Sequence, residues 1–122
     1  MIEGNKHIEG LYMKQGDNGW GVYCKNDIKS GDLIERVIMY RLKNVDGNEN
    51  PHLFTWSDDR KLWAGGTGFS PFYNHSANPN MIKKGDLPND ILEYYASRDI
   101  KKEEELVGAY FSKKWRTCFK SF

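Results

Sequence analysis

The sequence predicts a mostly β domain, on three observations. Segments rich in β-branched and aromatic residues, such as LIERVIMYRL at 33–42, alternate with turn-forming Gly, Asn and Asp. The 122 residues suffice for one domain with a core. The 39% hydrophobic and 14% aromatic content argues against disorder. A helix competes at 33–42, because Leu33, Val37 and Tyr40 also fit a 3.6-residue period.

The other predicted elements are short strands between turns. QGDNGWG and KNVDGNENPH are turn-rich, and GGTG at 65–68 predicts flexibility or a close approach of backbones. DIKSGDLI at 27–34 weakly echoes DIKKEEELV at 99–107, which we interpret as two similar strand entries. After a short mixed segment at 7–14, further strands are predicted to begin at GVYC (21–24) and to lie in HLFTW (52–56), KLWA (61–64), ILEYYASRD (91–99) and EELVGAYF (104–111).

Charge and hydropathy exclude several classes of protein. Lys and Arg number 18 and Asp and Glu 17, a balance that argues against a general nucleic-acid binder. No stretch approaches the roughly 20 apolar residues of a membrane span, and the first ten residues do not resemble a signal peptide. We therefore expect a soluble, intracellular protein with no membrane partner. Cys24 and Cys118 cannot build a four-cysteine zinc site, and we expect no metal.

The most informative stretch is FYNHSANPN, residues 72–80. Asn74 and His75 offer directional donors and acceptors without a fixed charge, which suits a polar small ligand better than a metal. Pro79 restricts the preceding residue to extended conformations, and the Asn80 amide can tie the turn to a neighbouring segment. Taken alone, the stretch is also compatible with an ordinary polar turn.

Two further stretches carry weaker signals. NGWG at 18–21 has two glycines that let a backbone approach a ligand closely, but it lacks the further residues of a nucleotide-triphosphate loop. In EELVGAYF, Tyr110 follows Gly108 and Ala109, so its hydroxyl could line a narrow channel. The alternatives are a tight turn for the first stretch and a half-buried core tyrosine for the second.

The order of these stretches resembles the SET-domain family of protein lysine methyltransferases. GWG, then FxNHSxxPN, then ELxxxY occur in the family's order and near its spacing, and the resemblance covers residues 5–115. The chain looks like the small stand-alone SET proteins of some viruses and bacteria. The resemblance implies one SET domain over residues 1–122, with a β-clip fold of several short curved sheets, few short helices and a C-terminal pseudoknot.

The resemblance also implies the cofactor S-adenosylmethionine. It assigns cofactor binding to the backbone of Asn18, Gly19 and Trp20 and to the side chains of Asn74 and His75. In the family an aromatic residue beyond the catalytic tyrosine often covers the adenine. Trp115 is the first candidate for this role and Phe111 the second, with core packing as the alternative.

By the same resemblance, Tyr110 is the catalytic tyrosine beside an in-line transfer of a methyl group to a neutral lysine amine. His52, Phe54 and Tyr73 are candidates for the wall of the substrate channel, although core packing is an equal alternative for each. Gly108 stands where many relatives carry an aromatic residue that limits methylation. A glycine there favours multiple methylation.

The chain departs from the family at several positions. Ala77 replaces a common cysteine, and Glu103 replaces a common glycine, which puts only a local turn in doubt. The cysteine cluster that closes the channel in many relatives is missing after Tyr110, so the tail at 111–122 is expected to take its place. A second subunit could complete the site instead, which predicts a homodimer.

Three functions therefore compete at the level of sequence. The first is methylation of a lysine on a protein substrate, with a histone tail as the family's commonest target and no direct contact with nucleic acid. The second is a non-catalytic module of the same fold that binds the cofactor or a peptide. The third is a small β-barrel that binds single-stranded nucleic acid through its aromatics, which the balanced charge opposes. The target lysine and the compartment, cytoplasm or a host nucleus, are not encoded in these patterns.

Overall fold

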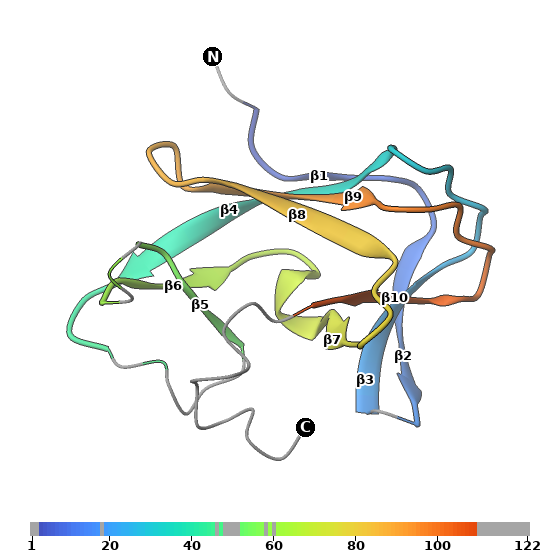
Figure 1. Cartoon of the computed structure of the whole chain (residues 1–122), viewed down its shortest axis with the longest axis horizontal. Helices are drawn as coiled ribbons and strands as arrows, with labels where there is room; N and C mark the ends of the chain where they lie inside the picture. Colours follow the sequence, from blue (N-terminus) through green and yellow to red (C-terminus); the bar gives the residue numbers. More distant parts are fainter. Residues whose placement is uncertain are drawn as a thin grey trace.

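Two curved β-sheets form the body of the protein (Figure 1). The computed structural model describes residues 3–17, 19–45, 47, 52–57, 59 and 61–109. The strands are β1 (Lys6–His7), β2 (Leu11–Gly16), β3 (Gly19–Cys24), β4 (Leu33–Leu42), β5 (Leu53–Thr55), β6 (Trp63–Gly66), β7 (Asn74–His75), β8 (Met81–Asp86), β9 (Ile91–Ala96) and β10 (Glu105–Gly108). A 3₁₀ turn, η2 (Ser70–Phe72), precedes β7.

The longest strand, β4, organises the larger sheet. The strand order is β5-β6-β4-β9-β8, and the short β1 also pairs with β4. Strand β9 pairs with residues 33–38 of β4, β6 pairs with residues 39–42, and β1 pairs with Glu35 and Arg36. Tertiary hydrogen bonds therefore select the strand over the competing helix. A register shift between Leu33 and Glu35 leaves both Ile34 and Glu35 buried, although they are neighbours in sequence.

The smaller sheet has the order β2-β3-β10-β7. Strand β10 lies antiparallel to β3 and parallel to β7, so it stands between two segments that are far apart in the sequence (Figure 1). This insertion places the GWG stretch, Asn74 and His75 of the NHS stretch, and Glu105–Gly108 of the ELxxxY stretch in one sheet. The predicted mostly β fold of short curved sheets is confirmed. The threading of the C-terminal segment stays a prediction, because residues 110–122 lie outside the described part.

The sequence echo corresponds to a direct contact. Ile28 and Ile100, the second residues of the two echoing segments, form an isolated antiparallel bridge with a hydrogen bond of 2.8 Å in each direction. Both side chains are buried in the core. The two similar segments therefore pair with each other, and this bridge joins the segment before β4 to the segment before β10.

The glycine stretch at 65–68 allows a close approach of chain segments. Gly65 and Gly66 belong to β6, and a Cβ at Gly65 would overlap the Tyr40 ring across the sheet. Strand β8 was missed by sequence, because MIKKGD reads as a polar segment without a clear alternation. Among the residues that the structure describes, no helix is long and apolar enough to cross a membrane.

Candidate functional site

Pairing with β10 brings the polar motifs of the sequence together. In the parallel ladder with β7, Val107 lies opposite Asn74 and Gly108 opposite His75. On the other side of β10, Glu105 lies opposite Tyr23 on β3, the strand that also carries the GWG stretch. Of the residues predicted to bind the cofactor, Gly19 and Trp20 on β3 therefore lie one strand away from Asn74 and His75 on β7.

Asn74 links the three motifs through its side-chain amide. Its Nδ2 donates to the Trp20 carbonyl at 3.1 Å and to the Glu105 carboxylate at 2.7 Å. A Cβ on Gly21 would overlap Glu105 and lie 3.1 Å from Asn74 Nδ2. The second glycine of the GWG stretch therefore makes room for this carboxylate and amide. None of the described residues donates a hydrogen bond to Asn74 Oδ1, which is available as an acceptor.

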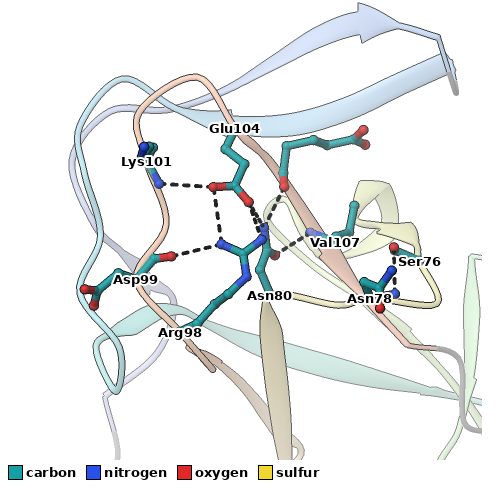
Figure 2. A network of polar contacts seen from close by, with 9 residues as sticks. Ser76, Asn78, Asn80, Arg98, Asp99, Lys101, Glu104 and Val107 are labelled. Carbon is teal, nitrogen blue, oxygen red and sulfur yellow. Dashed lines mark hydrogen bonds and ion pairs between the residues drawn. The ribbon is translucent and has the colours of Figure 1, made fainter.

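Asn80 fastens the loop after β7 onto β10 (Figure 2). Its side chain is 1% exposed, donates to the Glu105 carbonyl at 2.8 Å and accepts from the Val107 N–H at 2.9 Å. Its own N–H donates to the Val107 carbonyl at 3.1 Å. Asn80 thus makes three hydrogen bonds to the backbone of β10, as a paired strand would. This confirms the prediction that the Asn80 amide ties the turn to a neighbouring segment.

An ion pair of Arg98 with Glu104 borders this network (Figure 2). Hydrogen bonding to Arg98 is the main reason that the pKa of Glu104 lies below its ordinary value, and the Lys101 N–H at 3.2 Å adds to the effect. Glu103, which replaces the family's glycine, has a φ of +68°, a left-handed conformation that favours glycine. The Tyr12 hydroxyl donates to the Glu103 carboxylate, which raises the pKa of Tyr12 to about 12.

A cleft opens beside the Asn74 end of β7. Its wall is mostly aromatic or small, and Lys83 is the one lining residue among those described that carries a formal charge. The Lys83 ammonium lies 5.4 Å from the centroid of the Phe54 ring. The described lining residues are Phe54, Ser70, Pro71, Tyr73, Asn74, Lys83, Tyr94, Gly108 and Ala109.

The residues predicted for the substrate channel are placed differently from one another. Phe54, Tyr73 and Gly108 line the cleft, and no described atom lies within 4 Å of a Cβ built on Gly108. Tyr73 is also a core residue, because it is 5% exposed and its hydroxyl donates to Glu35 at 2.7 Å. His52 is not among the lining residues, and its Nδ1 lies 2.7 Å from the Pro71 carbonyl oxygen.

The residues predicted for the cofactor are described only in part. Gly19 has a φ of +83°, and no described atom lies within 4 Å of a Cβ placed on it. Trp20 is 55% exposed, and His75 is half-buried on β7. Asn18, Tyr110, Phe111 and Trp115 lie outside the described residues, so their roles stay predictions. Within the described segments, no three His, Cys, Asp or Glu side chains gather as a metal site would require.

Sequence reasoning missed three polar residues around the cleft. Glu105 begins the ELxxxY stretch, so its position in the motif could have marked it as the partner of Asn74. Glu35 shares the inward face of β4 with Val37 and Met39, and this alternation was a usable signal for a buried carboxylate. Lys83 reads as ordinary surface, because no motif around it indicates that β8 passes the cleft.

Comparisons with known proteins agree with this arrangement. A model of the SET domain family matches residues 19–111, which is more than half of the chain. A Schizosaccharomyces pombe protein named histone-lysine N-methyltransferase, H3 lysine-37 specific, is 30% identical over 104 residues, which cover 80% of this chain and 69% of that protein.

Solved structures show the same fold in longer proteins. The Neurospora SET domain protein DIM-5, a histone lysine methyltransferase, is 25% identical with a TM-score of 0.63, over 82% of this chain and 51% of that one. KRYPTONITE, solved in complex with mCHG DNA and SAH, is 22% identical with a TM-score of 0.66, over 87% of this chain and 24% of that one.

The family match and the histone-lysine methyltransferase relatives identify a domain of the protein-lysine N-methyltransferase class. The chain belongs to the SET-domain family.

Proposed function

We propose that the chain uses S-adenosylmethionine to methylate a lysine side chain of a protein, in an in-line transfer beside Tyr110. One observation carries the proposal: the structure joins Asn74, Trp20 and Glu105 by hydrogen bonds at the end of a cleft that Ala109 lines. Tyr110 directly follows Ala109 in the chain, and we propose it as the tyrosine that serves this cleft.

The groups around Asn74 fit the amino-acid end of the proposed cofactor. Asn74 Oδ1 is an available acceptor, the Glu105 carboxylate supplies negative charge, and the backbone at Gly19 is open to a neighbour. These groups suit an ammonium and a sulfonium, which both carry positive charge. When bound, the cofactor would supply an electrophilic methyl group on its sulfonium. We further propose that Trp115, on the undescribed tail, covers the adenine.

The aromatic wall of the cleft provides what the substrate amine needs. A free lysine has a pKa of about 10.4, so its amine is mostly protonated at neutral pH. Phe54, Tyr73 and Tyr94 give the cleft an aromatic lining that would displace water from a bound amine, and desolvation lowers the pKa of an amine. In this proposal, the Tyr110 hydroxyl orients the neutral amine by a hydrogen bond and does not act as a base. Alignment and desolvation then account for most of the rate enhancement.

The names of the relatives suggest the substrate. The fission-yeast relative is named for a lysine of histone H3, and the Neurospora protein is a histone lysine methyltransferase. We therefore propose a histone tail as the substrate and, because Gly108 leaves space in the cleft, transfer of more than one methyl group. We also propose that the tail at 111–122 closes the channel, either within one chain or in a homodimer that sedimentation velocity would detect.

A methyl-transfer assay with a matched variant tests the proposal. The chain is incubated with labelled S-adenosylmethionine and recombinant core histones, beside Tyr110→Phe, and cofactor affinity is measured by calorimetry. We expect label on a histone band, loss of most turnover in the variant, and cofactor affinity close to that of the original chain. Full turnover in Tyr110→Phe would reject the role of Tyr110. Cofactor binding without transfer to any protein would favour the non-catalytic module.

A further inference from the structure

Glu35 is a carboxylate enclosed in the core of the domain. It is 2% exposed and lies on the central strand β4, where the register shift after Leu33 turns it inward. Burial is the main cause that raises the pKa of Glu35, and hydrogen bonds from the Phe69 N–H and the Tyr73 hydroxyl oppose that rise. A buried carboxylate is costly unless donors satisfy it, so the partners of Glu35 show what its presence stabilises.

Both donors to Glu35 come from one short segment. The Tyr73 hydroxyl donates to Oε1 at 2.7 Å, and the Phe69 N–H donates to Oε2 at 2.9 Å. Just before them, Gly68 has a φ of +63°, and a Cβ there would overlap Glu35 Oε2. The chain therefore passes directly over the carboxylate at residue 68, and Glu35 holds the segment at its two ends, 69 and 73.

This same segment forms one wall of the cleft. Ser70 and Pro71 of η2, Tyr73 and Asn74 all line it. The Tyr73 ring packs against Tyr94 with the centroids 4.6 Å apart, so a shift of Tyr73 would move both the wall and the residue that follows. Because Asn74 directly follows Tyr73, the geometry of the proposed cofactor site depends on where this segment is anchored.

We propose that Glu35 is a positioning residue of the site, which fixes the cleft wall at 69–74 by accepting hydrogen bonds at both ends of that segment. The inference rests on the proposed function for the use of the cleft, but the hydrogen bonds that carry it belong to this chain alone. Glu35 touches neither the cleft nor the reacting atoms and acts through Tyr73 and the Phe69 N–H.

The test compares two changes at Glu35 with one control elsewhere in the core. Glu35→Gln keeps an oxygen that can accept from Phe69 and gains an amide that can donate to the Tyr73 oxygen once that hydroxyl turns. Glu35→Met keeps the length and removes both acceptors. Leu92→Ala is the control, because Leu92 is buried on β9 and does not line the cleft, so the change lowers stability without removing either hydrogen bond that anchors the segment.

Two measurements are made at a temperature where circular dichroism shows every variant folded. The first is kcat and KM with S-adenosylmethionine and core histones. The second is peptide-resolved hydrogen–deuterium exchange over residues 66–75 without any ligand. We expect Glu35→Met to lower kcat/KM by about tenfold or more, since small misplacements in a site are costly. Exchange should rise only in that segment. Glu35→Gln should keep most of the original kcat/KM and most of the original protection from exchange at 66–75. Leu92→Ala should keep the kinetic constants of the original chain.

The two readouts separate failure of this inference from failure of the proposed function. If the original chain transfers no methyl group, the proposed function fails, and local exchange in Glu35→Met against Leu92→Ala still decides the inference. Unchanged exchange at 66–75 in Glu35→Met would overturn it in either case. A loss of kcat/KM in Leu92→Ala as large as in Glu35→Met would also overturn it, because the effect would then follow global stability.

Discussion

Replacing Asn80 by Ala tests whether one buried amide holds β10 in the smaller sheet. The change removes the acceptor for the Val107 N–H at 2.9 Å and the donor to the Glu105 carbonyl at 2.8 Å. Asn80 is 1% exposed, so water cannot readily take the place of the lost amide. Each buried backbone group left without a partner costs about 1–3 kcal/mol, which gives a loss of about 2–6 kcal/mol for the two.

Urea unfolding followed by circular dichroism measures this loss. The total stability of a domain is about 5–15 kcal/mol, so the expected change is a large fraction of it. Asn78→Ala is the matched control, because Asn78 is exposed in the same loop and should change stability by no more than about 0.5 kcal/mol. If Asn80→Ala lowers the free energy of unfolding by less than about 1 kcal/mol, and the slope of that free energy against urea concentration is unchanged, the reasoning is refuted.

Three further predictions follow from the site and its border. Gly21→Ala places a Cβ against the Glu105 carboxylate, which binds Asn74, the residue proposed to bind the cofactor. Calorimetry should therefore show weaker binding of S-adenosylmethionine by about tenfold or more. Gly85→Ala, where a Cβ finds its first neighbour at 3.5 Å, should bind as the original chain does. Gly108→Phe should fill the space in the cleft, so mass spectrometry should find only monomethyl-lysine. Continued trimethylation would contradict the proposal that the space at Gly108 permits transfer of more than one methyl group. Because the pKa of Glu104 is lowered in the folded state, its pair with Arg98 stabilises the fold above the unfolded pKa of about 4.3. This contribution is lost as the pH falls through the folded pKa. Arg98→Ala should therefore weaken the dependence of the urea midpoint on pH between about 6 and 3. An unchanged pH dependence would show that the ion pair of Arg98 with Glu104 does not cause it.

Local sequence patterns were sufficient to predict the structure where residues adjacent in the chain determine it. The strands at 91–96 and 105–108 and the turn around Pro79 were predicted, because alternation and proline geometry act within a few residues. The polar strand β8 was missed, since its pairing with β9 comes from tertiary hydrogen bonds and not from its composition. The helix alternative at 33–42 was likewise excluded only by the strands that pair with β4.

Within the site, the sequence indicated which residue types take part but not how they are joined. The motifs named Asn74, Tyr73 and Phe54, and all three line the cleft. The sequence could not show that the Glu105 carboxylate would bind Asn74, or that Lys83 would line the cleft. These contacts join strands that are far apart in the sequence.

The sequence by itself determined the fold class, the family resemblance and the residues that carry polar chemistry, since these depend on side-chain identity and order. Only the tertiary structure decided that β10 lies between β3 and β7 and that Glu35 anchors both ends of the segment at 69–74. The physical reason is that hydrogen bonds between distant segments depend on strand register. A shift by a single residue, such as the one between Leu33 and Glu35, changes which side chains face the core.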